Sequence, residues 1–215
     1  MSSRIQNDSF NKDNVNKTII RNYIRYYLRL PIKSEYTIDD MADDGVSVLD
    51  HLNIENAHIL GISMGGMIAQ IMASSYPEKT KTFTLIASTA STPSPFNGPS
   101  KDVRRLFIER TKNVDATIED RVSRTKKLFK LIGYQGIDLD TQEFSDNVKL
   151  SIERGGVDDT GFGRQLTAIL GSKNRIEKVR SIAAPTLIIH GKEDPLIGVK
   201  NAYRSNKLIK GSKLV

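Results

Sequence analysis

The sequence contains no cysteine and no tryptophan, and only three of its 215 residues are histidine. Without cysteine the chain has no disulfide framework and no thiol chemistry, which is compatible with a reducing cytoplasm. No apolar run is long enough to cross a membrane, and the polar N-terminus carries no secretory signal pattern. Internal repeats and metal- or nucleotide-binding motifs are also lacking. We therefore expect a cytoplasmic protein with no membrane span, no metal and no cofactor.

The most informative stretch is residues 57–70, where an apolar run leads into the pattern G-x-S-x-G and then into a further apolar segment. The apolar residues before the pattern predict a buried parallel strand, and those after it recur at helical spacing until Pro77. A serine on such a strand-to-helix turn presents its hydroxyl to a base, so Ser63 is the candidate nucleophile. The alternative is a chance glycine-serine turn, and the flanking strand and helix favour the nucleophile.

The residues next to Ser63 fit the same interpretation. We expect Gly61 and Gly65 to flank a strained serine at a point where side chains would collide, and Gly66 to let the helix approach the sheet. The backbone N–H of Met64 lies at the helix N-terminus, where it can stabilise a developing oxyanion.

A second strand ends close to a carboxylate. Residues 186–189 form a short β-branched run that Gly191 ends, and Asp194 follows just past the predicted strand, where ligand-facing residues gather in open parallel sheets. Asp194 can act as the acid that orients a catalytic imidazole, or it can cap a helix that begins at Pro195. The presence of the Ser63 turn favours the acid.

The run from Tyr36 to Ser88 resembles the α/β-hydrolase family, and most closely its carboxylic-ester branch of aclacinomycin methylesterase-like and pimeloyl-carrier methyl ester esterase-like enzymes. Residues 164–169 and 184–196 resemble the same branch, in which a lid helix precedes the strand that presents the triad acid. The resemblance implies a serine hydrolase with Ser63 as nucleophile, Asp194 as acid and a small-molecule ester as substrate.

The histidine of such a triad is missing from its expected place. In this family the order along the chain is serine, acid, histidine, but no histidine follows Asp194. We expect a solvated His51, a His58 at the far end of the sheet, and a His190 that does not act as base because it would have to turn back across the sheet. Loss of the base costs about a million-fold in rate, so we expect this chain alone to be inactive.

The resemblance also implies that the chain is an internal fragment of the fold, without the strands before residue 57 and without the loop that donates a second oxyanion N–H. A split gene, a frameshift and a deliberate truncation all remain open. A non-catalytic, partner-binding remnant of a hydrolase is the alternative function.

We therefore expect a partial α/β-hydrolase fold in which a parallel sheet of about three strands carries helices and a helical lid. Strands are expected at 57–62, 82–87 and 185–190, and lid helices at 103–111, 118–132, 141–153 and 159–170. The expected segments are a polar and basic N-terminal segment (1–35), a core with the nucleophile (36–95), a lid (96–172) and a core with the acid (173–215).

In this arrangement the strand before Ser63 becomes a sheet edge with unpaired backbone. The N-terminal helix can cover this edge, or the chain can associate with itself or with a complementing chain. An apolar share of only 38% agrees with an incomplete core.

The net charge of +7 is concentrated near the N-terminus, where residues 1–35 hold seven basic and three acidic side chains. The predicted helix at 17–30 is basic and amphipathic, which suits a membrane surface, a nucleic acid or a water-exposed surface helix. We favour the surface helix, and expect no nucleic-acid partner because only one helix carries the pattern.

Four carboxylates lie on a second predicted helix, which Thr37 begins in a capping-box-like pattern. They suit a metal site or a solvated face, and we favour the solvated face. These residues are Asp39, Asp40, Asp43 and Asp44.

Overall fold

The computed structural model describes residues 12–92, 98–112, 116–155 and 159–215. Its centre is a parallel sheet with the strand order β1-β2-β3-β4. The strands are β1 (Ala57–Ile62), β2 (Thr80–Ile86), β3 (Thr186–Ile189) and β4 (Lys213–Leu214). The sheet confirms the α/β class, and β4 adds a fourth strand to the three expected. Two residues are too few to give a sequence pattern, and β4 is held by hydrogen bonds to its neighbour.

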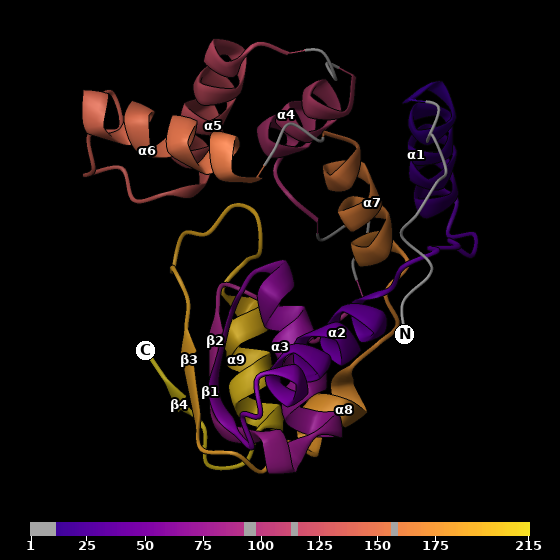
Figure 1. Ribbon diagram of the computed structural model, residues 1–215, viewed down its shortest axis with the longest axis vertical. Coiled ribbons are helices and arrows are strands. Elements are labelled where there is room, and N and C mark those ends of the chain that lie inside the picture. The colour runs from indigo at the N-terminus through magenta and orange to yellow at the C-terminus, as the bar shows by residue number, and fades with distance from the viewer. Residues whose placement is uncertain (1–11, 93–97, 113–115, 156–158) are drawn as a thin grey trace.

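The helices fall into a group beside the sheet and a group beyond one end of it (Figure 1). The first group consists of α2 (Ile38–His51), α3 (Met64–Ser75), α8 (Ile176–Arg180), α9 (Lys200–Leu208) and the short 3₁₀ turn η1 (Pro77–Lys79). The second group consists of α1 (Lys12–Tyr27), α4 (Lys101–Lys112), α5 (Ile118–Ile132), α6 (Gln142–Gly155) and α7 (Asp159–Leu170). In the described residues, no helix combines the length and hydrophobicity needed to span a bilayer.

One face of the sheet carries the core. Phe83, Leu85 and Ile188 point from the strands into a buried apolar cluster formed with α3, α8 and α9. A second cluster joins α3 to α2, which begins at Thr37 in the expected capping box. Apolar residues of α3 therefore contact both the sheet and α2, and α3 is held in place from both sides.

The opposite face of the sheet is exposed, and we call it the open face. Its apolar side chains alternate with the core residues along the strands, and the parallel register places Leu60 beside Thr84 and Leu187, and Ile62 beside Ile86 and Ile189. Leu60 and Ile62 are 61% and 56% exposed, and both lie on β1. Because β1 is the edge strand of the described sheet, its outer backbone and its open-face side chains both lack cover.

The N-terminal helix lies elsewhere than at this edge. Helix α1 packs against α7 and α4, which places it beside the lid (Figure 1). Residues 1–11 of the expected N-terminal segment lie outside the described part of the chain.

Candidate active site

Ser63 occupies the turn between β1 and α3 in a strained backbone conformation. Its φ of 52° and ψ of −117° lie where side chains are disfavoured. The Ser63 N–H donates to the carbonyl of Ile86 (3.0 Å), and its carbonyl accepts from the hydroxyl of Ser88 (2.7 Å). The Ser63 side chain makes no capping hydrogen bond to α3. Both backbone groups are therefore anchored to β2 and the residues after it, while the hydroxyl is left for other partners.

The two glycines of the pattern and Gly66, which follows it, have different surroundings. A Cβ at Gly61 would collide with the carbonyl of Gly65, and one at Gly66 would lie 2.6 Å from the Cβ of Ser88. Both positions therefore require glycine, as expected. A Cβ at Gly65 would meet nothing within 4 Å, so the expected collision at that position is wrong. The space for a side chain at Gly65 is open, although the Gly65 backbone forms the close contact with Gly61.

Asp194 lies in the loop after β3, and one of its oxygens stabilises that loop. Its Oδ1 accepts hydrogen bonds from the backbone N–H groups of Leu196 (2.8 Å) and Ile197 (2.9 Å). No helix begins at Pro195, and the next helix, α9, begins at Lys200. The carboxylate therefore caps a turn rather than a helix. Its Oδ2 is not used in these two bonds.

His190 lies against Asp194 but is poorly placed to act as a base. Its Nε2 is 3.5 Å from Asp194 Oδ2 and 2.5 Å from the carbonyl oxygen of Ile197, and its side chain is 1% exposed. Because a carbonyl only accepts, the close contact requires a proton on Nε2. A protonated Nε2 cannot take the proton of a serine. His58 bonds to Thr82 on the open face, and His51 lies in the last turn of α2.

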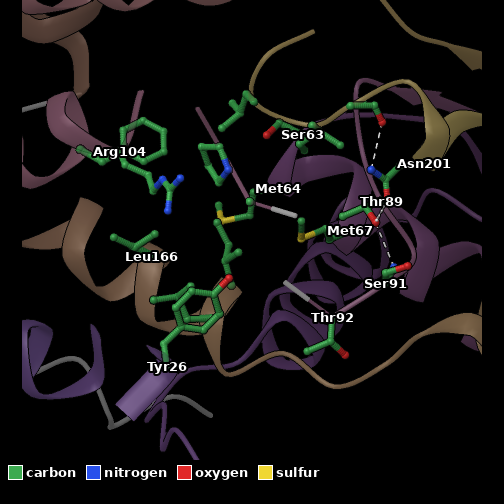
Figure 2. Close-up of a pocket in the computed structure, with 18 of the residues that line it drawn as sticks. Tyr26, Ser63, Met64, Met67, Thr89, Ser91, Thr92, Arg104, Leu166 and Asn201 are labelled. Carbon is green, nitrogen blue, oxygen red and sulfur yellow. Dashed lines mark hydrogen bonds between the residues drawn. The ribbon is translucent and has the colours of Figure 1, made fainter. Parts of the chain in front are cut away.

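A cavity of about 1490 Å³ brings the candidate residues together between the core and the lid. Ser63, Met64 and Asp194 all line it, and no histidine does so among the described residues. Met64 is the first residue of α3, so its backbone N–H has no partner within the helix. Figure 2 shows Ser63 on one side of the cavity, with Arg104 and Leu166 of the lid across from it. The cavity thus holds a hydroxyl, a carboxylate and a helix N-terminus, but no imidazole.

Polar residues after β2 fasten this side of the cavity to α9. The hydroxyl of Thr89 donates to Asn201 Oδ1 (2.7 Å) and accepts from the N–H of Ser91 (3.0 Å), as Figure 2 shows. Arg204 Nη1 donates to the hydroxyl of Ser91 (2.9 Å). Sequence patterns did not single out these residues, because their partners are more than 100 positions away.

Arg175 is a buried cation that sequence patterns do not single out. It is 3% exposed, and it donates to Gln70 Oε1 (3.2 Å) and to the carbonyl of Thr89 (2.9 Å). Burial lowers the pKa of Arg175 to about 10. Its two bonds connect α3 to the loop after β2, so it supports both sides of the Ser63 turn. An arginine in a short charged segment gives no sequence signal of such burial.

The lid side of the cavity is formed partly by tyrosines of α1. Tyr23, Tyr26 and Tyr27 line it, and the Tyr27 hydroxyl accepts from Arg104 Nη1 (3.2 Å). Burial raises the pKa of Tyr26 to about 12, and burial with the hydrogen bond to Tyr27 raises that of Tyr23 to about 12. The hydrogen bond with Tyr23 and the neighbouring Arg104 lower the pKa of Tyr27. The expected surface helix therefore contributes a cavity wall.

The four carboxylates of α2 have separate partners. Asp39 pairs with Lys178 (2.7 Å), and Asp40 forms the capping box with Thr37. Asp43 accepts from Tyr76 (2.7 Å), and Asp44 from Tyr36. These contacts hold α2 to its neighbours and give no common site.

Comparison with known proteins gives consistent matches over most of the chain. A family model described as the alpha/beta hydrolase fold matches residues 16–215. Rhodomycin D methylesterase DnrP of Streptomyces peucetius is 24% identical over 195 residues, and the AB hydrolase superfamily protein YisY of Bacillus subtilis is 28% identical over 184 residues. Each match covers 84% of this chain and 65% of the relative. A hydrolase from Pseudomonas aeruginosa PA01 matches with a TM-score of 0.65 and 20% identity, covering 86% of this chain and 65% of that one.

Proposed function

Because the chain belongs to the alpha/beta hydrolase fold family, we propose that it is a serine hydrolase of carboxylic esters or lactones. The single observation that carries this proposal is the strained Ser63 at the start of α3, in one cavity with Asp194. The relatives named as methylesterases support the ester substrate. The chain spans 65% of the length of these relatives, so substrate and activity are proposed for the site and not taken from them.

In the proposed reaction the Ser63 hydroxyl attacks the ester carbonyl, and its proton passes to an imidazole held by Asp194. The Met64 N–H stabilises the oxyanion, the alcohol leaves with the proton, and water then hydrolyses the acyl-serine. We assign the hydroxyl, the carboxylate and the N–H to this chain, whereas none of its three histidines lines the cavity. We propose that the imidazole must come from outside these 215 residues.

Free imidazole provides a test. Release of p-nitrophenol from p-nitrophenyl butyrate is measured for the wild type, Ser63→Ala and Asp194→Asn over increasing imidazole concentration. We expect a wild-type rate near that of Ser63→Ala without imidazole, about a million-fold below a complete triad. Added imidazole should raise the wild-type rate above the Ser63→Ala background and raise the Asp194→Asn rate less.

Two results would contradict the proposal. A fast Ser63-dependent rate without imidazole would show that the chain holds its own base. A rate that rises equally for wild type and Ser63→Ala would show that imidazole acts in solution alone.

The open face and the β1 edge favour a second candidate function, the binding of a complementing polypeptide. We propose that this polypeptide pairs with β1, covers Leu60 and Ile62, and brings an imidazole to the cavity. Its source would be the part of the relatives' fold that this chain does not match, about a third of their length. An exposed edge strand with apolar side chains is a template for such pairing.

Mixing tests this candidate. The chain is combined with a polypeptide made of the segments of rhodomycin D methylesterase that it does not match, and the complex is followed by sedimentation and ester turnover. We expect a one-to-one complex whose turnover requires Ser63. Self-association alone, or a complex without turnover, would reject complementation.

A further inference from the structure

The cavity contains a guanidinium that has no carboxylate partner among the residues that the structure describes. Arg104 extends from α4 into the cavity wall, and its Nη1 donates to the hydroxyl of Tyr27. Its Nε is buried and has no acceptor in the described part of the chain. Figure 2 shows the guanidinium directed toward the cavity, across from Ser63. A buried donor on a charged group is costly when it stays unpaired, so this group favours a ligand that brings an acceptor.

The surroundings of Arg104 are apolar and aromatic. Phe107 of the same helix packs edge-on against Phe162 of α7, with ring centroids 5.6 Å apart, and both rings line the cavity. Ile24 and Leu166 line it as well. Such a wall binds a hydrocarbon or aromatic group, and it strengthens electrostatic attraction by excluding water.

The charges around the cavity favour an anion. The other cations that line it are Lys192, Lys200 and Arg204, whereas its carboxylates, Glu193 and Asp194, both lie in the loop after β3. The lining described in the structure therefore carries four basic and two acidic side chains. Arg104 is paired with a tyrosine hydroxyl rather than an acid, and this hydrogen bond raises its pKa further, so its charge persists.

We propose that Arg104 is a specificity-determining residue that binds a carboxylate of the substrate, with the apolar wall holding the hydrocarbon part and Ser63 facing the ester. The substrate class is thus an ester or lactone that carries a separate carboxylate. This inference rests on the proposed function only in taking the cavity as the substrate site. A guanidinium pairs with a carboxylate through two parallel hydrogen bonds. Arg104 therefore suits a single carboxylate of the substrate, while the ester group lies at the Ser63 hydroxyl.

Calorimetric binding without turnover tests the proposal. The probes are phenylbutyrate, its neutral amide, and phenylpropyl phosphate, which separates a carboxylate preference from general anion binding. We expect the wild type to bind phenylbutyrate about ten- to a hundredfold more tightly than the amide, and more tightly than the phosphate. Arg104→Gln should remove this preference. Arg104→Lys keeps the positive charge but not the planar guanidinium that forms two parallel hydrogen bonds, so it should retain part of the preference.

Matched controls separate this site from the other cations. Arg105→Gln changes the next residue of α4, which pairs with Glu109 on the surface, and it should keep the preference. Arg204→Gln changes a cavity-lining cation of α9, and it should reduce the preference less than Arg104→Gln does. Equal binding of acid and amide, no binding of any probe, or a preference lost in Arg204→Gln but kept in Arg104→Gln would overturn the proposal. Because no hydrolysis is measured, these outcomes are independent of whether Ser63 is acylated.

Discussion

At the residue scale, the turn at Ser63 depends on the two glycines whose neighbours leave no room for a side chain. Hydrogen bonds to Ile86 and Ser88 stabilise the strained backbone of Ser63. The close packing of Gly61 and Gly66 brings these groups near enough to form the bonds. A side chain at Gly65 would meet nothing within 4 Å. The five-residue motif therefore combines one glycine that the packing requires, Gly61, with one that it does not, Gly65, while Gly66 follows the motif.

The pair Gly61→Ala and Gly65→Ala tests this difference. We expect Gly61→Ala to lower the free energy of unfolding by about 2–3 kcal/mol, because the added methyl group meets backbone that must move. Gly65→Ala should change it by less than about 1 kcal/mol, and toward higher stability, because alanine is the better helix former. Urea unfolding measures both. Equal losses in the two variants would show that Gly65 is packed.

At the element scale, local sequence patterns predicted the strands and helices well, and long-range contacts poorly. The capping pattern at Thr37, the apolar period after Ser63 and the β-branched run at 186–189 each depend on neighbours within a few residues, and each element was found. The role of α1 as a cavity wall and the burial of Arg175 depend on partners far away in the chain. The spacing of apolar residues along a helix predicts that the helix has an apolar face, but it does not predict which part of the protein that face contacts.

The stability of α5 as a function of pH tests one such local interaction, the capping box at its N-terminus. Thr117 begins this helix in a capping box, and hydrogen bonds from its side chain and backbone lower the pKa of Asp120. A carboxyl whose pKa is lowered in the folded state stabilises above its unfolded pKa of 3.8, and this stabilisation is lost as the pH falls through the folded value.

We therefore expect hydrogen exchange in α5, corrected for intrinsic rates, to accelerate between about pH 5 and about pH 3. Helix α3 has no titratable side chain and serves as the internal reference. Asp120→Asn should weaken α5 at the higher pH and reduce its pH dependence. An unchanged α5 profile in this variant would assign the acid response to other groups of the lid.

At the scale of the whole molecule, the described residues cover the sheet on one side only. Leu60 and Ile62 on the open face are each more than half exposed, and β1 is the edge of the described sheet. This apolar surface and the edge beside it suit pairing with another chain.

We expect the purified chain to associate with rising concentration through this surface. Leu60→Lys combined with Ile62→Lys should suppress the association, because charges on an edge strand oppose pairing. Val48→Lys combined with Leu52→Lys is the control, since these residues are equally exposed but lie on α2 and at its end. Sedimentation velocity measures the effect. Loss of association in the control alone would place the contact on α2.

We propose Ser63 as a nucleophile in a cavity that no histidine of the chain lines. The most direct measurement is peptide mapping by mass spectrometry after incubation with p-nitrophenyl butyrate and imidazole. We predict a butyryl group on the peptide that contains Ser63, in an amount that rises with imidazole and falls to zero in Ser63→Ala. Butyryl groups only on other residues, or the same labelling of Ser63 without imidazole, would contradict it.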